Sequence, residues 1–360
     1  MERRRFLELT GGFAAGALAA PRALALGGEA RSGEFSGWSW VHGNGDNPGV
    51  WRDRFARLRA AGLRGVLVGG GDTIRLAEAA RSEGLAFHAW TWILNRSGDG
   101  WVKANHPEWF SVSRKGESSL DKPPYVPYYQ WLCPSREPVR EYLRGVVGEI
   151  AAMPGVDGVH LDYIRHPDVI LPKALWAKYG LVQDHEMAEF DFCYCEVCRA
   201  AFRRESGADP LQLPDPAVSQ AWREFRWNSV TGVVARLARA VRERGKLISA
   251  AVFPTPSIAR RLVRQAWEQW PLDLVFPMTY HGFYEEGIPW IEGAVREGVA
   301  ALGGRAPLHA GLYLPDLQPE QLGEAIAAAK AGGAAGVSVF EMGGLSDGHL
   351  AVLKNALPRL

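Results

Sequence analysis

Short apolar runs and amphipathic segments alternate along most of this chain. The runs are rich in β-branched and aromatic residues and are bounded by Gly, Pro or polar residues, which is typical of buried strands. We predict strands at residues 35–42, 64–69, 85–94, 156–165, 246–253, 272–280, 307–314 and 335–341. Apolar residues at helical spacing predict helices at residues 48–61, 73–82, 137–153, 221–244, 257–270, 290–302, 319–331 and 349–357. Ser135 is the predicted N-cap of the third helix.

Eight strand–helix units in about 330 residues predict an α/β fold of the (β/α)8 TIM barrel type. The barrel is predicted as a single domain over residues 33–360, with long loops after the third and fourth strands. The second long loop, at about 166–217, is predicted to be a cysteine-containing insertion. A doubly wound open sheet is the structural alternative. It is disfavoured because residues 43–46, which follow the first strand, lack the Gly-x-Gly-x-x-Gly pattern of a phosphate loop.

The first 25 residues have the features of an export signal. Arg3-Arg4-Arg5-Phe6-Leu7 resembles a twin-arginine signal, residues 11–20 are small and apolar, and Ala23-Leu24-Ala25 offers a cleavage site. We predict export by the twin-arginine route to the periplasm or the cell exterior. An ordinary secretory signal with a basic start is the alternative. No apolar run reaches the roughly 18 residues that a membrane span needs, so no span is predicted.

Charge and composition narrow the choice of partners. The formal net charge is +1, and removal of residues 1–25 leaves 37 basic and 38 acidic side chains. Because no basic block occurs, we predict no nucleic-acid partner. The chain contains 14 Trp residues, whose flat apolar faces match the C–H face of a pyranose, although Trp is also common in cores. The sequence does not indicate an oligomeric state.

The most informative acidic residue is Asp162, which stands at the carboxyl end of the fourth strand. Strand alternation places Gly158, His160 and Asp162 on one face. A carboxylate in this position is costly to desolvate unless it has partners or a chemical task. The alternative is an Asp that only fixes the following loop.

Functional side chains of (β/α)8 barrels lie at the carboxyl ends of the strands. There, Asp162 and Glu341 are the two best-placed carboxylates, with aromatic residues and without a phosphate-binding loop. Glycoside cleavage needs one carboxyl group to protonate the leaving oxygen and a second to attack or to activate water. We predict Asp162 as the nucleophile or electrostatic stabiliser and Glu341 as the general acid/base. The residues predicted to bind a carbohydrate substrate are Trp40, His42, Trp90, Trp92, His160, Arg165, Tyr280, His281 and Tyr313.

Other carboxylates, besides Glu341, are candidates for the general acid. Strand alternation places Val337, Val339 and Glu341 on one face. Glu341 is alternatively a structural carboxylate that bonds Arg165 or a loop amide. The other candidates for the acid are Asp72, Glu285, Glu286 and Asp316. The fourth and eighth strands lie opposite each other across a barrel, which favours the inverting carboxylate separation of ~6.5–9.5 Å over the retaining ~5–5.5 Å.

Two other classes of function remain open. His42, His88, His160, His281 and His309 lie on or near five strands, and a metal-dependent hydrolase barrel uses such ligands. Buried histidines that bond to their barrel neighbours are the structural alternative. A non-catalytic glycan-binding barrel would keep the aromatic residues and tolerate the loss of either carboxylate.

The four cysteines form one further motif. Cys193, Cys195 and Cys198 make a C-x-C-x2-C run, and Cys133 is the only other cysteine. Four thiolates suit a tetrahedral structural zinc, which would join the two long loops beside the active face. The alternative is oxidation, with Cys195 paired to Cys198, or Cys133 paired to one of the three. No organic cofactor is predicted.

Two stretches resemble known families. Residues 156–167, Val-Asp-Gly-Val-His-Leu-Asp-Tyr-Ile-Arg-His-Pro, resemble the strand-four signature of glycosyl-hydrolase-like barrels, in particular glycosyl-hydrolase-like family 10 and its relatives. This resemblance implies a (β/α)8 barrel that acts on a glycan, with Asp162 as the motif's acidic residue. Tyr163 replaces a second acid found in some members, so the resemblance does not define the catalytic pair.

The cysteine run is similar to the zinc-binding loop of family 42 β-galactosidases. Cys193-x-Cys195-x2-Cys198 is followed by Arg199-Ala-Ala-Phe202, and Cys133 matches that family's more distant fourth ligand. The family's catalytic Asn-Glu pair on strand four is replaced here by Leu161-Asp162. The resemblance therefore implies the metal site and not β-galactosidase activity.

Overall fold

The computed structural model describes residues 34–45 and 47–358 of the 360-residue chain. Its eight strands form one parallel sheet with the order β6-β5-β4-β3-β2-β1-β8-β7. The β6 and β7 strands complete the ring through bridges between Val275 and Leu308 and between Met278 and Gly311. The predicted (β/α)8 barrel is therefore confirmed. The predicted export signal at residues 1–25 lies outside the described residues.

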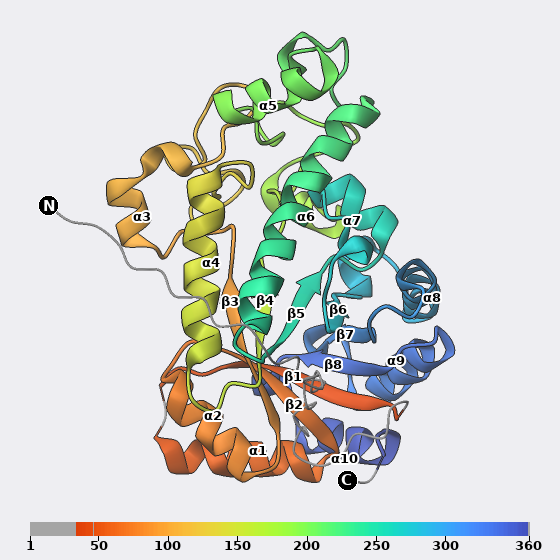
Figure 1. The fold of residues 1–360 in the computed structure, drawn as a ribbon. Helices are drawn as coiled ribbons and strands as arrows, with labels where there is room; N and C mark the ends of the chain where they lie inside the picture. Colours follow the sequence, from red (N-terminus) through yellow and green to blue (C-terminus); the bar gives the residue numbers. More distant parts are fainter. Residues whose placement is uncertain (1–33, 46, 359–360) are drawn as a thin grey trace, which may run out of the picture.

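The strands and helices alternate in the predicted order (Figure 1). The strands are β1 (Ser36–His42), β2 (Leu63–Gly69), β3 (Ala86–Trp92), β4 (Gly158–Asp162), β5 (Leu247–Val252), β6 (Leu274–Pro277), β7 (His309–Tyr313) and β8 (Gly336–Phe340). The α-helices are α1 (Pro48–Ala60), α2 (Thr73–Ser82), α3 (Gly100–Asn105), α4 (Glu137–Ala152), α5 (Glu196–Ser206), α6 (Gln220–Arg242), α7 (Pro256–Val263), α8 (Trp290–Leu302), α9 (Pro319–Ala331) and α10 (Asp347–Ala356).

Two local predictions were wrong, and the two long loops contain helices that the sequence pattern did not predict, α3 and α5. The helix predicted at 257–270 ends at Val263, because Arg264 adopts a left-handed conformation with φ 55°. Ser135 does not cap α4: the N-cap position belongs to Arg136, whose side chain makes no capping hydrogen bond.

The core has two layers. The larger layer lies between the sheet and the surrounding helices and contains the aliphatic residues of alternate strand positions, such as Val159 and Val337. The smaller layer fills the barrel with bulky rings, among them Trp38, Trp40 and Phe276. This interior is packed by side chains and forms no channel, as in other barrels of this size.

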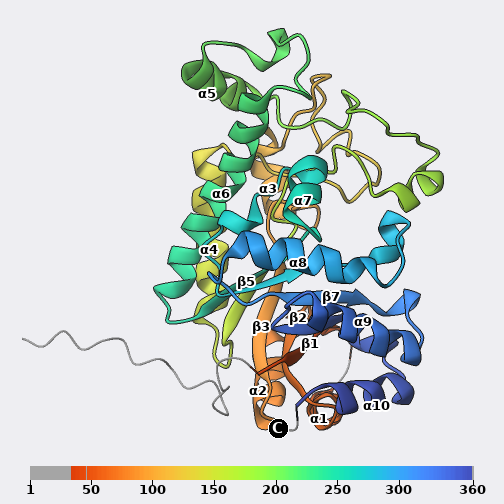
Figure 2. The same cartoon turned by 90° about the vertical axis from the view of Figure 1, so that its right-hand side faces the viewer.

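The two long loops extend the barrel at one end. In both views, α5 lies at the end of the molecule opposite α1 and α10 (Figures 1 and 2). An isolated bridge joins Phe110 to Leu132 within the loop after β3, and a second bridge, from Ser113 to Phe192, joins this loop to the loop after β4. Among residues 34–45 and 47–358, no helix combines the length and the apolar character needed to cross a membrane.

Candidate active site

Asp162 ends β4 and is held by two N–H donors. The indole Nε1–H of Trp90 donates to Oδ2 at 2.9 Å, and the backbone N–H of Tyr163 donates to Oδ1 at 2.7 Å. Burial raises the pKa of Asp162, while the two hydrogen bonds and the charge of Arg165 act in the opposite direction. Tyr163 adopts φ 48°, a conformation that is uncommon for residues other than Gly and concentrates at functional sites. The carboxylate is thus both oriented and partly shielded from water.

Glu341 lies on the other side of the barrel mouth, next to His42. The Nε2 atom of His42 is 3.6 Å from Oε2 of Glu341, and the two side chains are 51% and 32% exposed. The ring of His42 also contacts the ring of Trp90, with centroids 4.9 Å apart. A continuous set of contacts therefore joins Asp162, Trp90, His42 and Glu341. The alternative in which Glu341 bonds Arg165 is wrong, because Arg165 pairs with another carboxylate.

Strand alternation does not account for the position of Glu341 at the mouth. Val337 and Val339 pack in the outer layer between the sheet and the helices, whereas Phe340 packs with the barrel interior. Strand alternation would therefore direct Glu341 away from the mouth. However, β8 ends at Phe340, so Glu341 lies outside the alternating segment and its side chain reaches His42.

Aromatic rings line the mouth on two sides. Trp92 is 36% exposed and is the direct strand partner of Asp162, and its ring contacts those of Tyr128 and Tyr163. On the opposite side, the rings of Tyr280 and Tyr313 lie 5.2 Å apart and both contact Phe340.

Tyr280 lies close enough to Asp162 for the charge of this carboxylate to affect the pKa of the Tyr280 hydroxyl. Burial, followed by this neighbouring carboxylate, raises the pKa of Tyr280. Tyr128, which we did not predict from the sequence, is 45% exposed beside Trp92. The helical and strand patterns carry no signal for Tyr128, because it lies inside the long loop after β3.

Arg165 was predicted to contact substrate, but its side chain is largely committed within the protein. It is 7% exposed, and its Nη1 lies 2.8 Å from Oδ2 of Asp168. Its guanidinium also lies 4.8 Å from the ring centroid of Trp131 and 5.3 Å from that of Tyr163. Arg165 thus fixes the aromatic loop beside Asp162, and its charge is paired with Asp168, a residue that we did not predict from the sequence.

Trp40 and His160, also predicted to bind substrate, belong to the barrel interior. They are 1% and 0% exposed, and Nε1–H of Trp40 donates to Nε2 of His160 at 3.1 Å. The Oγ of Ser249 lies 3.0 Å from Nδ1 of His160 and 2.8 Å from Nδ1 of His88. These groups are hydrogen-bonded to one another beneath the mouth, and the buried side chains of Trp40 and His160 offer no surface to a ligand, which corrects the prediction for both residues.

The histidines do not assemble a metal site. His88, His160 and His309 are buried, and burial lowers the pKa of each, so they are neutral near pH 7. In the part of the chain that the structure describes, the four cysteines are the only group of three or more His, Cys, Asp or Glu side chains close enough to share one ion. The arrangement of ligands thus argues against the metal-dependent hydrolase alternative.

The other candidate acids occupy separate positions. Asp72 is the N-cap of α2 and accepts from the N–H of Arg75, and Glu285 pairs with Lys173. Asp316 is exposed and lies close to Gly282: a Cβ added to Gly282 would be 2.4 Å from Oδ2 of Asp316. The charge of Asp316 acts on its neighbour His281, whose pKa is lowered by burial. Asp316 and His281 therefore lie together on the rim between β6 and β7.

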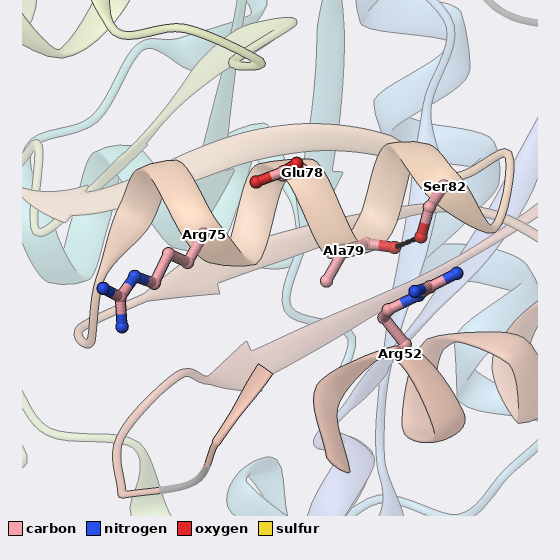
Figure 3. Close-up of a pocket in the computed structure, with 5 residues that line it drawn as sticks. All are labelled: Arg52, Arg75, Glu78, Ala79 and Ser82. Carbon is pink, nitrogen blue, oxygen red and sulfur yellow. Dashed lines mark hydrogen bonds between the residues drawn. The ribbon is translucent and has the colours of Figure 1, made fainter. Parts of the chain in front are cut away.

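Two shallow grooves on the molecular surface do not belong to the mouth. One, of about 360 Å³, lies between α1 and α2 (Figure 3) and is lined by Arg52, Arg75, Glu78, Ala79 and Ser82. The other, of about 350 Å³, is lined by charged residues of α4 and α6. Neither groove contains a residue from the carboxyl end of a strand, so neither is a candidate active site.

The four cysteines gather into a buried cluster between the two long loops. Their sulfur atoms all lie within 4.8 Å of one another, and Cys133 Sγ is 3.6 Å from Cys195 Sγ and 3.4 Å from Cys198 Sγ. All four are free thiols, so the disulfide alternative is not what this structure contains. Hydrogen bonding among the sulfurs lowers the pKa of Cys195 and raises that of Cys198.

The donor set fits a tetrahedral metal ion. A tetrahedron with metal–sulfur bonds of ~2.3 Å has sulfur–sulfur edges of about 3.8 Å, close to the distances above. The backbone N–H of Val112 also donates to Cys193 Sγ at 3.4 Å, a hydrogen bond of the kind that orients metal ligands.

Comparisons with known proteins agree on the fold. No family model matches the chain, and no curated protein matches it in sequence. The chain is similar to the PgaB (BpsB) glycoside hydrolase domain from Bordetella bronchiseptica, with a TM-score of 0.62, 14% identity, and coverage of 89% of this chain and 97% of that one. It is also similar to the catalytic domain of β-amylase from Paenibacillus polymyxa, with a TM-score of 0.60, 10% identity, and coverage of 90% and 98%.

A third similar structure is the β-galactosidase from the psychrophilic Marinomonas ef1. The TM-score is 0.63 with 12% identity; 89% of this chain is covered, but only 58% of the galactosidase. At such low identities the similarity establishes a common (β/α)8 architecture.

Proposed function

We propose that this chain is a glycoside hydrolase that cleaves an O-glycosidic bond in a poly- or oligosaccharide. The observation that carries the proposal is Asp162, a carboxylate oriented by two N–H donors at the end of β4 and surrounded by aromatic rings. Three structures with the same fold, a glycoside hydrolase domain, a β-amylase and a β-galactosidase, support this class.

In the proposed mechanism, Glu341 protonates the leaving glycosidic oxygen as the bond to the anomeric carbon breaks. The negative charge of Asp162 stabilises the oxocarbenium-like transition state, and its carboxylate takes a proton from the attacking water. β4 and β8 are four strands apart in the eight-stranded ring, and the rings of Trp90 and His42 lie between the two carboxylates. This separation supports an inverting reaction.

The mouth supplies the groups that would hold a sugar. Trp92 offers an exposed indole face for stacking, and Tyr280 and Tyr313 form the opposite wall. His42, whose side chain is 51% exposed, would hydrogen-bond hydroxyl groups, whereas His281 is 8% exposed and would contact a sugar only at the rim. Arg165 acts by fixing the aromatic loop beside Asp162.

The test is a hydrolysis screen over a panel of glycans, including peptidoglycan strands, with the wild type, Asp162→Asn and the exposed control Asp184→Asn. We expect the wild type and the control to release reducing ends from the same glycan, and Asp162→Asn to be inactive with an unchanged melting temperature. Full activity of Asp162→Asn would remove this residue from the mechanism. Binding of a glycan without cleavage by any of the three proteins would instead favour the non-catalytic glycan-binding barrel.

We also propose that the cysteine cluster holds one structural zinc ion. Cys133, Cys193, Cys195 and Cys198 would be its ligands, and the ion would supply a closed tetrahedral cross-link between the loops after β3 and β4. The four buried sulfurs and their mutual distances support this proposal.

Export by the twin-arginine route is part of the proposal. It is supported by Arg3-Arg4 followed by Phe6-Leu7 and an apolar stretch. Replacement of Arg3 and Arg4 by Lys should retain the protein in the cytoplasm of a host with this pathway, as measured by cell fractionation. Unchanged export of this variant would indicate an ordinary secretory signal.

A further inference from the structure

An exposed tryptophan outside the mouth has no role in the site described above. Trp101, in the first turn of α3, is 55% exposed, and α3 lies beside α4 on the outside of the barrel (Figure 1). Its indole stacks on the ring of Tyr142 from α4, with centroids 5.7 Å apart and an angle of 23° between the planes. An exposed Trp side chain presents a large, flat apolar face on which a ligand can stack.

The indole is held in place by its neighbours. His106 packs against the edge of the Trp101 ring at 5.0 Å and itself stacks on the buried Trp109 at 3.9 Å. Asp99 caps α3 by accepting from the N–H of Val102, and it also accepts a hydrogen bond from the hydroxyl of Tyr142. The aromatic side chains are therefore held in place before a ligand binds, so binding does not carry the entropic cost of ordering them.

The surroundings of the indole are polar. Asn105, one helical turn after Trp101, is exposed and donates from Nδ2 to the carbonyl oxygen of Trp101 at 2.9 Å. The exposed Glu108 lies 3.3 Å from Nδ1 of His106. A single flat apolar face with amide and imidazole groups at its rim suits a pyranose ring, and it lacks the contiguous apolar area of a protein interface.

One residue connects this group to the mouth. Nη1 of Arg96 donates to the carbonyl oxygen of Trp92 at 3.0 Å, and Nη2 donates to the hydroxyl of Tyr142 at 3.2 Å. Trp92 is the exposed strand partner of Asp162, whereas Tyr142 supports Trp101. Arg96 thus bonds both the backbone of Trp92, at the candidate catalytic carboxylate, and the ring of Tyr142 that supports Trp101 outside the mouth.

We propose that Trp101, supported by Tyr142 and His106, is a second saccharide-binding platform that holds a glycan chain extending out of the mouth past Trp92. The substrate class is therefore a polysaccharide, bound over several sugar units. This inference rests on the proposed glycoside hydrolase function for its link to cleavage, but the binding itself can be measured separately.

The binding experiment uses the full mature protein carrying Asp162→Asn, so that the polymer stays intact. Binding to chitin, cellulose and peptidoglycan strands is compared for this protein, for the same protein with Trp101→Ala or Trp101→Phe, and for a control with Leu211→Ala. Leu211 is also exposed, at 45%, in the insertion after β4. We expect Trp101→Ala to weaken binding of one polymer by about tenfold, with Trp101→Phe intermediate and the control unchanged.

The kinetic experiment uses otherwise wild-type protein. The ratio of kcat/KM on the polymer to kcat/KM on a trisaccharide of the same linkage should fall about tenfold in Trp101→Ala, because only the polymer reaches the platform. Equal polymer binding with and without Trp101, or binding to none of the three probes, would overturn the proposal. If Trp101-dependent binding is found while no glycan is cleaved, the platform stands and the proposed hydrolase function fails.

Discussion

The indole of Trp90 lies between the two candidate catalytic carboxylates. Its Nε1–H donates to Oδ2 of Asp162 at 2.9 Å, while its ring contacts the imidazole of His42, which in turn lies 3.6 Å from Glu341. We assigned Trp90 from the sequence to substrate contact. The structure gives it a second task, which is to orient Asp162 and to influence the protonation of this carboxyl group.

Trp90→Phe should shift the pH profile of the enzyme. Burial already raises the pKa of Asp162, and the indole hydrogen bond opposes this rise. Removal of the donor should therefore raise the pKa further, by about half to one pH unit for a bond worth about 1 kcal/mol. Because Asp162 must be ionised to act, activity appears as the pH rises through this pKa. The acidic limb of kcat/KM against pH should therefore move to higher pH.

Trp227→Phe is the matched control for this experiment. It removes the indole hydrogen bond from Trp227 to the carbonyl oxygen of Arg260, which lies outside the mouth. Its acidic limb should coincide with that of the wild type. A limb that stays in place in Trp90→Phe would show that the group governing the acidic limb is not Asp162.

Glu341→Gln should be sensitive to the leaving group. Without a general acid, kcat/KM on natural glycosides should fall by about 10²–10⁴-fold, because the leaving oxygen must then depart unprotonated. The loss on a p-nitrophenyl glycoside of the same sugar should be much smaller, since nitrophenolate leaves without a proton. Asp316→Asn and Glu286→Gln are the comparisons. If either of them, rather than Glu341→Gln, has this pattern, the acid has been assigned to the wrong residue.

The order of elements and the barrel itself were predictable because each strand carries a local signal. β4 and β8 are short runs of apolar residues bounded by Gly or polar groups, and the helices α2, α8 and α9 have the predicted limits. The helices α3 and α5 were missed because they are short and lie in loops without a long apolar period. The early end of α7 depends on the conformation of Arg264, whose buried guanidinium pairs with Glu186 from the insertion.

The site was predictable only at the level of strand ends. The position of Asp162 after an apolar run placed it at the mouth, and this does not depend on distant residues. The partners of Arg165 and the neighbour of Glu341 depend on how loops fold back, which no local pattern encodes. Trp40 and His160 were misplaced for another reason: alternation gives the face of a strand but not the depth in the barrel at which a side chain lies.

The cysteine cluster should contain one zinc ion per chain. Elemental analysis of the purified mature protein should give one zinc, and p-chloromercuribenzoate should release it as the thiols react. Cys198→Ser should lose the ion and lower the free energy of unfolding by at least about 3 kcal/mol, because a closed structural site contributes directly to folding. Detection of fewer than four thiols in denaturant, together with absence of zinc, would support disulfides instead.

The buried histidines should make the fold sensitive to mild acid. Burial lowers the pKa of His88 and of His309 from 6.5 to about 3. Between pH 6.5 and pH 3 the unfolded chain binds protons at these histidines that the folded chain does not bind. The contribution of the neutral histidines to the free energy of unfolding is therefore fully present above pH 6.5 and is lost as the pH is lowered. Each histidine should contribute about 1.4 kcal/mol per pH unit within this window.

Denaturant titrations at pH 7.5, 6.0 and 5.0 measure this effect. His309→Gln removes one titrating group, and its amide can replace the contact with Ser36 Oγ, which lies 2.8 Å from Nε2 of His309. The slope of the unfolding free energy against pH should therefore decrease by the contribution of one proton, about 1.4 kcal/mol per pH unit. An unchanged slope would mean that His309 binds a proton in the folded state as readily as in the unfolded chain.

Gly158→Ala should disturb the barrel interior. An added Cβ at position 158 would lie 2.5 Å from Nε2 of His88. The ring of His88 cannot easily retreat, because its Nδ1 bonds Ser249 Oγ at 2.8 Å and its edge packs against Trp38 at 5.1 Å. We expect a loss of about 2 kcal/mol in the free energy of unfolding, as for other insertions into a packed core.

Gly145→Ala is the control, because position 145 lies inside α4 and an added Cβ there meets no atom within 4 Å. That change should stabilise the protein by about 0.5–1 kcal/mol, since Ala has the higher helix propensity. The opposite signs of the two substitutions separate a steric effect in the barrel from a general effect of replacing glycine. If Gly158→Ala proved as stable as the wild type, His88 would have to be free to move. The hydrogen bonds that link His88 to Ser249, His160 and Trp40 would then not keep the side chains beneath Asp162 in a single conformation.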